Sequence, residues 1–535
     1  QIIKKYKLKE LNILKEKYSE AYYKEKNKAL LLASKKGWKT SYTNDKGSYF
    51  ELIRVSEEGK PLYYRTFNID AAASTRTNFL HNNGGLGLNI EGQGMTAHVW
   101  DGGIARATHQ EYFGDGEESR FSVGDGSADL SFHAAHVTGT MIASGVDPLA
   151  KGMAPKATAV GYDWNNDEAE VTTAAANGML ISNHSYGYAV RDDDGEPLLP
   201  AFYFGGYINE SRIWDNIAYN APYYLMVTSA GNNGSDNTVN SDPLEGDNAF
   251  DKLTGNTTSK NNLVIANGND AIINTNGTLA SVSVSSGSSE GPTDDLRVKP
   301  DLMGNGTGLY STYETSDSAY RSISGTSMAS PNVAGSLLLL QQYYNETYGS
   351  FMRASTLKGL ALHTADDVAA EGPDAASGWG LMNAKKAAET VTKKGFQSII
   401  SEIELVNEST YTVVVKSDGI GPLSASISWT DLPGVANTGV VNDPTPVLVQ
   451  DLDIKVTNSS GETTATFLPW KLTSVNTNEK GDNIVDPYER VDIENASGEY
   501  TITISHKGTL QGGAQKVSLI VTGVSSGIAL LTSQS

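Results

Sequence analysis

Apolar and polar residues alternate in three different ways along this chain, and the changes mark three regions. In residues 7–36 the apolar side chains are spaced mostly by three or four positions among lysines and glutamates, which predicts an amphipathic helix that ends at Gly37. Short alternating segments separated by turn sequences follow at 38–42, 49–55 and 62–66. The first region is therefore expected to be a small α-plus-β unit.

Beyond Gly85, continuous apolar runs alternate with helical stretches. Strands are expected at 95–100, 157–162, 178–183, 223–230 and 263–267, and the helices between them include 135–144 and 169–177. Apolar strands that alternate with helices are typical of an α/β fold, in which a parallel sheet is covered by helices on both faces. Functional residues gather at the carboxyl ends of the strands in such folds.

Beyond residue 394 the pattern changes to short strands separated by turns. The expected strands are 403–406, 410–416, 424–429, 452–456, 500–504 and 515–521. This spacing predicts an all-β sandwich or jelly roll. The sequence thus predicts a basic N-terminal segment (1–67), an α/β domain (68–394), a β-sandwich domain (395–524) and a tail (525–535).

Composition narrows the classes of function. The chain of 535 residues has no cysteine, which excludes disulfides and thiolate metal sites. No window of about 18 uninterrupted apolar residues occurs, so no membrane span is expected. The chain begins with Gln1, and we expect a secreted protein whose signal peptide has been removed.

Charge is distributed unevenly between the first region and the rest. Residues 1–65 carry 16 Lys and Arg against 8 Asp and Glu, whereas the remainder carries 25 against 54. A body this acidic argues against nucleic-acid binding, because phosphates would be repelled. The basic helix alone is compatible with a solvated face, with a nucleic-acid or membrane-surface element, or with a pro-segment that covers an acidic enzyme.

A serine precedes an apolar run that contains four consecutive leucines. Ser327 lies in the segment Gly-Thr-Ser-Met-Ala-Ser-Pro, which we interpret as a turn that opens a buried helix, with Pro331 close enough to the start to be tolerated. At that place unpaired backbone N–H groups and the helix dipole would stabilise an oxyanion. The alternative role is that of a helix N-cap.

An activated serine needs a base, and the base needs a group that orients it. Asp101 ends an expected strand before a glycine turn, and His133 opens an expected helix. His133 and His136 together raise the question of a metal site, but they are three positions apart and no glutamate follows His133 as in the zinc-protease motif.

Taken together, these segments resemble the active site of subtilisin-like serine proteases (subtilases, peptidase family S8), in the chain order Asp, His, Ser. The resemblance implies that Asp101 orients the imidazole, that His133 acts as general base and then acid, and that Ser327 attacks the scissile carbonyl. It implies a structural role for His136. The family usually has Gly-Thr between the two histidines, where this chain has two alanines.

Two further segments extend the resemblance. The segment Thr-Ser-Ala-Gly-Asn-Asn-Gly places Asn232 at the position of the family's oxyanion-hole asparagine, which acts together with the Ser327 backbone N–H. The resemblance also implies a substrate-binding edge made by Ser185, Tyr186, Gly187 and Gly231. Tyr186 departs from the smaller apolar residue or tryptophan that is common there.

The C-terminal region resembles the β-barrel domain of some alkaline subtilases, distantly akin to the P-domain of kexin-like proteases. That likeness implies a structural calcium ion and no organic cofactor. Asp451 and Asp453 offer carboxylates on one face of an expected strand. The alternative is a charged face on an edge strand.

The sequence therefore predicts a secreted serine endopeptidase that acts on protein and peptide substrates. It is expected to be made as a zymogen that processes itself between Tyr64 and Ala73, with the pro-segment as its intramolecular inhibitor. Two alternatives stay open: an acid-acting serine-carboxyl peptidase, which uses glutamate in place of histidine, and a non-catalytic binding protein built on a degenerate protease fold.

Overall fold

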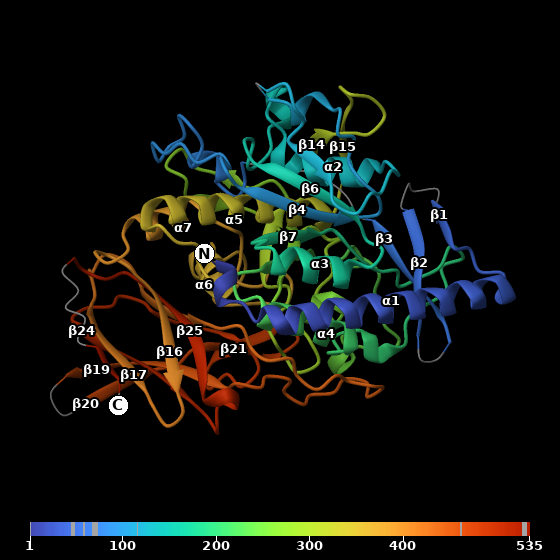
Figure 1. Cartoon of the computed structure of the whole chain (residues 1–535). Helices are drawn as coiled ribbons and strands as arrows, with labels where there is room; N and C mark the ends of the chain where they lie inside the picture. Colours follow the sequence, from blue (N-terminus) through green and yellow to red (C-terminus); the bar gives the residue numbers. More distant parts are fainter. Residues whose placement is uncertain are drawn as a thin grey trace.

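Three regions follow one another in the computed structural model of the chain (Figure 1). It describes residues 2–43, 49–56, 59–66, 73–114, 116–460, 463–526 and 532–534. A parallel sheet with its helices forms the centre, an N-terminal helix and three antiparallel strands lie along one side, and antiparallel sheets form the C-terminal part.

The central sheet has seven strands in the order β13-β10-β9-β7-β4-β6-β5, with every neighbouring pair parallel. Its strands are β4 (Thr96–Asp101), β5 (Phe121–Val123), β6 (Thr158–Asp163), β7 (Ile181–His184), β9 (Leu225–Ser229), β10 (Leu263–Gly268) and β13 (Leu302–Asn305). This sheet confirms the predicted α/β class, whose strands are apolar throughout because both faces are covered.

Helices cover both faces of the sheet. They are α2 (Phe132–Ile142), α3 (Asp167–Ala176), α4 (Asn209–Asn220), α5 (Thr326–Tyr348), α6 (Ala354–Thr364) and α7 (Ala384–Thr392). Helix α5 packs on α2 and on four strands of the sheet, and Figure 1 shows α3 and α4 on the opposite side. Leu337, Leu338, Leu339 and Leu340 are fully buried. The apolar run behind Ser327 is therefore the central core helix of this region.

Two short antiparallel strand pairs lie outside the central sheet. They are β11 (Ile272–Ile273) with β12 (Leu279–Ser281), and β14 (Leu309–Thr312) with β15 (Tyr320–Ile323).

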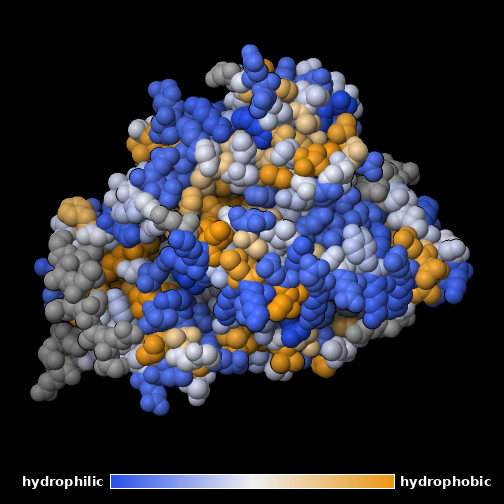
Figure 2. Space-filling view, viewed as in Figure 1, coloured by the Kyte–Doolittle hydropathy of each residue, from blue (hydrophilic) through white to orange (hydrophobic). Residues whose placement is uncertain are grey.

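The N-terminal segment lies on the surface of the central region. It consists of α1 (Leu8–Lys36), β1 (Ser41–Thr43), β2 (Tyr49–Val55) and β3 (Pro61–Thr66). Helix α1 ends at Gly37, as predicted, where φ is +74°. It packs against α3 and α4 through its buried apolar side, and Figure 2 shows mostly hydrophilic residues on its outer side. The predicted cleavage region includes residues 67–72, which lie outside the described residues.

Two antiparallel sheets and a hairpin make up the C-terminal region. One sheet has the order β16-β25-β18-β23, the other β20-β19-β24-β17-β26, and β21 pairs with β22. The strands are β16 (Ile399–Val406), β17 (Tyr411–Lys416), β18 (Leu423–Ser428), β19 (Leu452–Ser460), β20 (Thr463–Phe467), β21 (Trp470–Ser474), β22 (Thr477–Lys480), β23 (Tyr488–Ile493), β24 (Glu499–His506), β25 (Ala514–Thr522) and β26 (Thr532–Gln534). The end of the chain differs from the expected tail, because β26 pairs with β17.

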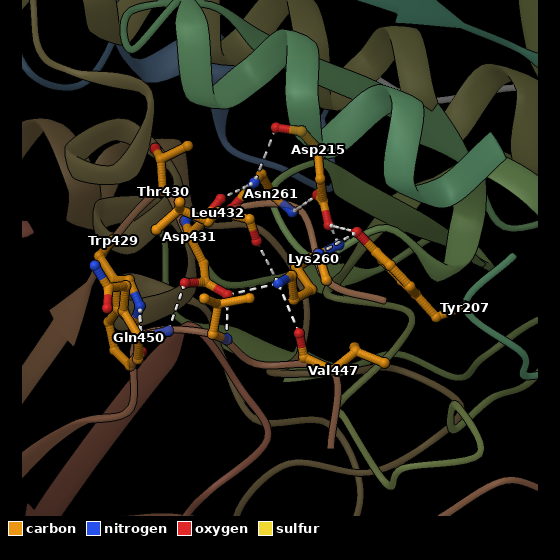
Figure 3. A network of polar contacts seen from close by, with 12 residues as sticks. Tyr207, Asp215, Lys260, Asn261, Trp429, Thr430, Asp431, Leu432, Val447 and Gln450 are labelled. Atoms are coloured by element: carbon orange, nitrogen blue, oxygen red, sulfur yellow. Dashed lines mark hydrogen bonds and ion pairs between the residues drawn. The ribbon is translucent and has the colours of Figure 1, made fainter. Parts of the chain in front are cut away.

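A buried ion pair joins the central and C-terminal regions (Figure 3). Lys260 Nζ lies 2.5 Å from Asp431 Oδ2, and both side chains are fully buried. The same ammonium donates to the carbonyls of Leu432 at 2.6 Å and Val447 at 2.9 Å. Apolar side chains of both regions also share one core. The C-terminal region is thus packed on the central one through apolar and charged contacts.

A search of the described ranges for long apolar helices finds none that could cross a membrane.

Candidate active site

The carboxyl end of β4 positions the first predicted catalytic residue. Asp101 is the last residue of the strand, and the N–H of Gly102 donates to its Oδ1 at 2.7 Å. His133 lies in the first turn of α2, behind the N-cap Ser131. Its Nδ1 is 2.7 Å from both carboxylate oxygens of Asp101. Because both side chains are fully buried, this contact fixes the ring with Nδ1 toward the carboxylate.

Ser327 is the second residue of α5, which places its N–H among the free donors of a helix N-terminus. Its Oγ donates to the carbonyl of Ser185 at 3.0 Å, and Ser185 Oγ donates to the carbonyl of Ser327 at 2.7 Å. Pro331 lies four positions further along the helix and has no N–H, so it cannot serve that carbonyl. The Ser185 hydroxyl supplies the missing donor.

Asn232 follows β9 and faces the start of α5. Its side-chain oxygen accepts hydrogen bonds from Thr326 N at 3.0 Å and Thr326 Oγ1 at 3.1 Å. Thr326 Oγ1 in turn accepts from the N–H of Gly231 at 3.2 Å. With the amide oxygen engaged, the amide nitrogen of Asn232 is left as the donor. Thr326 was not among the predicted site residues, although its place directly before Ser327 was the available signal.

His136 lies one turn along α2 and points away from the catalytic residues. Its Nε2 lies 3.2 Å from the carbonyl of Leu309 and 3.0 Å from that of Arg321. Burial lowers the pKa of His136 to about 3, which keeps the ring neutral. Within the described part of the chain, no cluster of three or more acidic or histidine ligands suits a metal ion. The contacts of His136 are those of a structural residue.

The predicted substrate-binding edge is paired with the N-terminal segment. Strand β8 (Tyr186–Tyr188) forms an antiparallel ladder with β3, in which Tyr64, Arg65 and Thr66 lie opposite Tyr188, Gly187 and Tyr186. The edge that would bind a peptide in an extended form therefore carries a strand of the same chain.

Tyr186 is almost completely buried beneath this edge. Its hydroxyl donates to Asp167 Oδ2 at 2.7 Å and lies 2.8 Å from His184 Nδ1. These contacts fit a tyrosine at this position, since its polar end has partners within the protein. Nearby, Gly231 has φ +106°, which favours glycine there.

The predicted calcium ligands lie around a lysine. Lys507 Nζ is 2.7 Å from Asp453 Oδ1, 3.3 Å from Asp451 Oδ2 and 2.6 Å from Asp482 Oδ1. A calcium ion would have to displace this ammonium, so these residues do not fit such a site in this arrangement. Calcium at Asp451 and Asp453 stays an untested prediction.

Residues 90–380 match the sequence profile of the subtilase family, Peptidase_S8, over more than half of the chain. The chain belongs to the subtilase family. The match covers all four segments that carried the predicted catalytic residues.

Curated relatives match parts of this subtilase. It is 26% identical over 255 residues to the alkaline proteinase of Hapsidospora chrysogena, covering 47% of this chain and 52% of that protein. It is 33% identical over 156 residues to the C5a peptidase of Streptococcus pyogenes, covering 26% and 13%. A PII-type proteinase of Lactococcus lactis subsp. cremoris is 43% identical over 75 residues, which cover 14% of this chain and 4% of that protein. The chain thus spans about half or less of the length of these curated relatives.

Two solved protease structures are similar at low identity. The self-cleaved protease domain of PatA has a TM-score of 0.42 and 18% identity, covering 57% of this chain and 98% of that chain. The patellamide maturation protease PatA has a TM-score of 0.41 and 18% identity, covering 57% and 99%.

Proposed function

We propose that this subtilase is a serine endopeptidase in which Asp101, His133 and Ser327 form the catalytic triad. The contact of His133 Nδ1 with both oxygens of Asp101 at 2.7 Å carries the proposal. A buried carboxylate beside Nδ1 holds the ring in the tautomer with the proton on Nδ1, so that Nε2 can accept a proton. The same carboxylate stabilises the imidazolium when it forms. Asn232 and the Ser327 N–H complete the site as the oxyanion hole.

The reaction proceeds by acyl transfer. Ser327 Oγ attacks the scissile carbonyl carbon while its proton passes to His133 Nε2, and the oxyanion accepts hydrogen bonds from Asn232 Nδ2 and Ser327 N. His133 then protonates the amine that leaves. A water molecule loses a proton to the same nitrogen, attacks the acyl-enzyme and releases the acid product with Ser327 restored.

The N-terminal segment acts in this proposal as an intramolecular inhibitor. Pairing of β3 with β8 supports this role, because a peptide substrate would need the same edge. Charge supports it too, since Arg54 contacts Glu168 at 3.3 Å and Lys39 contacts Asp193 at 2.7 Å. Protein substrates would bind to β8 once the segment has been cleaved and released. Secretion stays a prediction.

Labelling with a fluorophosphonate probe tests the proposed nucleophile. The processed protein should form a Ser327 adduct, and Ser327→Ala protein should form none and should keep its N-terminal segment. Equal processing of the two proteins would rule out self-cleavage. The absence of an adduct on processed protein would favour a non-catalytic binding protein.

The pH dependence tests the alternative of a serine-carboxyl peptidase. Activity that rises between about pH 5 and pH 8 and is lost in His133→Ala supports a histidine base. Activity that persists at acid pH in His133→Ala would instead support the carboxyl peptidase.

A further inference from the structure

A long loop of the C-terminal region crosses the surface of the central region. It connects β18 to β19, and its residues 434–447 lie against the segment that contains Tyr207 (Figure 3). Gly434 N donates to Tyr207 Oη at 3.1 Å, and Asn437 N donates to Tyr207 O at 2.7 Å. Val447 N donates to Asp295 Oδ2 at 3.2 Å. The loop is therefore held in place mainly by polar contacts with the central region.

Two buried aspartates lie under this loop without the partners that a carboxylate needs. Asp251 is fully buried and Asp294 is 4% exposed. Across the described residues, no hydrogen bond of standard geometry reaches Asp251 Oδ1 or either carboxylate oxygen of Asp294, although the backbone N–H of Asp443 in the loop lies near enough to lower the pKa of Asp294. The other oxygen of Asp251 accepts from Asn240 Nδ2 at 2.8 Å and Leu244 N at 2.9 Å. Three buried oxygens without partners are costly unless something else binds them.

Gly205 lets the two carboxylates face the same small space. It has φ +66°, and a Cβ at this position would collide with Asp294 Oδ1 and Asp251 Oδ1. Burial raises the pKa of both carboxyl groups, and the charge of Asp251 raises that of Asp294 further. The carboxylates of Asp251 and Asp294 thus lie close together beside Gly205, where there is no room for a side chain.

The nearby basic side chains make their hydrogen bonds and ion pairs with other groups, although Arg297 Nη2 has no hydrogen-bond partner among the described residues and the charge of Arg297 lowers the pKa of Asp294. Arg297 Nε lies 3.0 Å from Asp295 Oδ1, and its Nη1 donates to the carbonyl of Thr258 at 2.7 Å. Lys252 follows Asp251 in sequence, but its Nζ lies 3.2 Å from Glu290 Oε2. None of these contacts forms an ion pair with Asp251 Oδ1 or with Asp294.

We propose that a calcium ion binds between Asp251 and Asp294 and joins the 434–447 loop to the central region. Carboxylates are the ligands that this hard cation prefers, and its six to eight oxygen ligands are completed here by carbonyl oxygens and water. An adjoining cavity of about 210 Å³ would have room for such waters, and Asp294 and the loop residues 434–437, 443 and 445–449 line it. This site is separate from Asp451 and Asp453, which already form ion pairs with Lys507.

The competing occupant is a proton. Protonation of one or both carboxyl groups would also relieve their repulsion, with no metal required. The two occupants predict opposite results for an isosteric amide. Asparagine at 294 would remove a ligand from a calcium site, whereas it would mimic a carboxyl group that is already neutral.

Thermal unfolding of full-length Ser327→Ala protein tests the proposal without self-digestion and without any dependence on activity. After removal of metal with EGTA, CaCl₂ in millimolar excess should raise the Tm by at least about 3 °C, and MgCl₂ should raise it less. Asp294→Asn and Asp251→Asn should each lose this calcium-induced shift. An EGTA-treated Tm within a few degrees of the parent would show that the variants are folded.

The double variant Asp451→Asn/Asp453→Asn is the matched control and should keep the shift. Terbium luminescence gives a second readout, because Tyr207 lines the cavity and would sensitise the bound ion. The proposal would be overturned if calcium still raised the Tm of Asp294→Asn. It would also be overturned if the calcium-induced rise in Tm were lost only in Asp451→Asn/Asp453→Asn. The absence of any calcium effect together with an equal or higher Tm of Asp294→Asn at pH 8 would overturn it too and would identify the proton as the occupant.

Discussion

Ser185 and Ser327 exchange hydrogen bonds with each other's backbone. The Ser185 hydroxyl donates to the carbonyl of Ser327 at 2.7 Å, and the Ser327 hydroxyl donates to the carbonyl of Ser185 at 3.0 Å. Because Pro331 leaves the Ser327 carbonyl without its helical donor, this exchange ties the first turn of α5 to the substrate-binding edge. The nucleophile and the edge are therefore positioned as one unit.

Removal of the Ser185 hydroxyl should loosen the nucleophile. We expect Ser185→Ala to lower kcat about tenfold with a smaller change in KM, because a buried carbonyl loses its donor and the start of α5 shifts. Steady-state kinetics on a peptide substrate measure both constants. Ser185→Thr keeps a hydroxyl and is the control. A KM effect alone would show that Ser185 acts only in substrate binding.

Thr326 should act through Asn232. Asn232→Ala is expected to lower kcat by about 10²–10³, as loss of the oxyanion-hole asparagine does in subtilisin. Thr326→Val removes one of the two donors that hold the Asn232 amide oxygen and should lower kcat by a smaller factor, about tenfold. In Asn232→Ala protein, the additional change Thr326→Val should have little further effect. Independent, multiplying effects would show that Thr326 acts by another route.

Local signals explain what could be predicted from the sequence. The segments around Asp101, His133, Asn232 and Ser327 are continuous, each ends or begins an element, and the carboxyl ends of parallel strands meet at one edge. Apolar periodicity gave the α/β class and the end of α1 at Gly37. Boundaries were less accurate: β7 begins at Ile181 rather than at Gly178, whose φ of +99° belongs to a turn.

Contacts between distant segments could not be predicted in this way. Pairing of β3 with β8 depends on a register that no local pattern determines. The partner of Asp431 is Lys260, which lies in a different region of the chain. The alternation of residues predicted that Asp451 and Asp453 lie on one face of a strand. It contained no information about Lys507, whose backbone N–H donates a hydrogen bond to the carbonyl of Asp451. Ion pairs of this kind follow from tertiary packing.

The stability of the protein should depend on the buried ion pair between Lys260 and Asp431, which joins the central and C-terminal regions. Lys260→Met would leave the buried carboxylate of Asp431 without its cation, which costs about 3–5 kcal/mol. We expect a clear fall in Tm in the Ser327→Ala background. Lys471→Met breaks a more exposed pair with Glu479 and should cost less than about 1 kcal/mol. The double variant Lys260→Met/Asp431→Leu should recover part of the loss, and a failure of Lys260→Met to lower Tm would contradict the assignment.

The N-terminal segment should be held partly by Arg54. Arg54→Glu would place a negative charge beside Glu168, so the segment should bind more weakly and the lag before peptide cleavage should shorten. Continuous assays of freshly purified full-length protein measure the lag. Lys17→Glu makes the same change in charge at an exposed position of α1 and should leave the lag unchanged. Equal effects of both variants would point to overall charge rather than to this contact.

The aspartates under the loop should make stability depend on pH in a calcium-sensitive way. Burial raises the pKa of Asp294 to about 8 and that of Asp251 to about 6, from 3.8. Without metal, the folded state therefore keeps protons that the unfolded state has released, and stability from this pair is lost as pH rises from about 4 to about 8. Calcium needs the ionised carboxylates, so its stabilising effect should grow over the same window.

The calcium-induced rise in Tm should thus be larger at pH 8 than at pH 5, measured in Ser327→Ala protein. Asp167 and Glu170 also have pKa values raised to about 8, so the stability of the protein alone does not isolate the pair. Comparison of the parent with Asp294→Asn isolates the pair. Asp167 and Glu170 titrate in both proteins, whereas stabilisation by calcium is expected only in the parent. A calcium shift that is the same at both pH values would contradict binding to carboxylates that must first lose a proton.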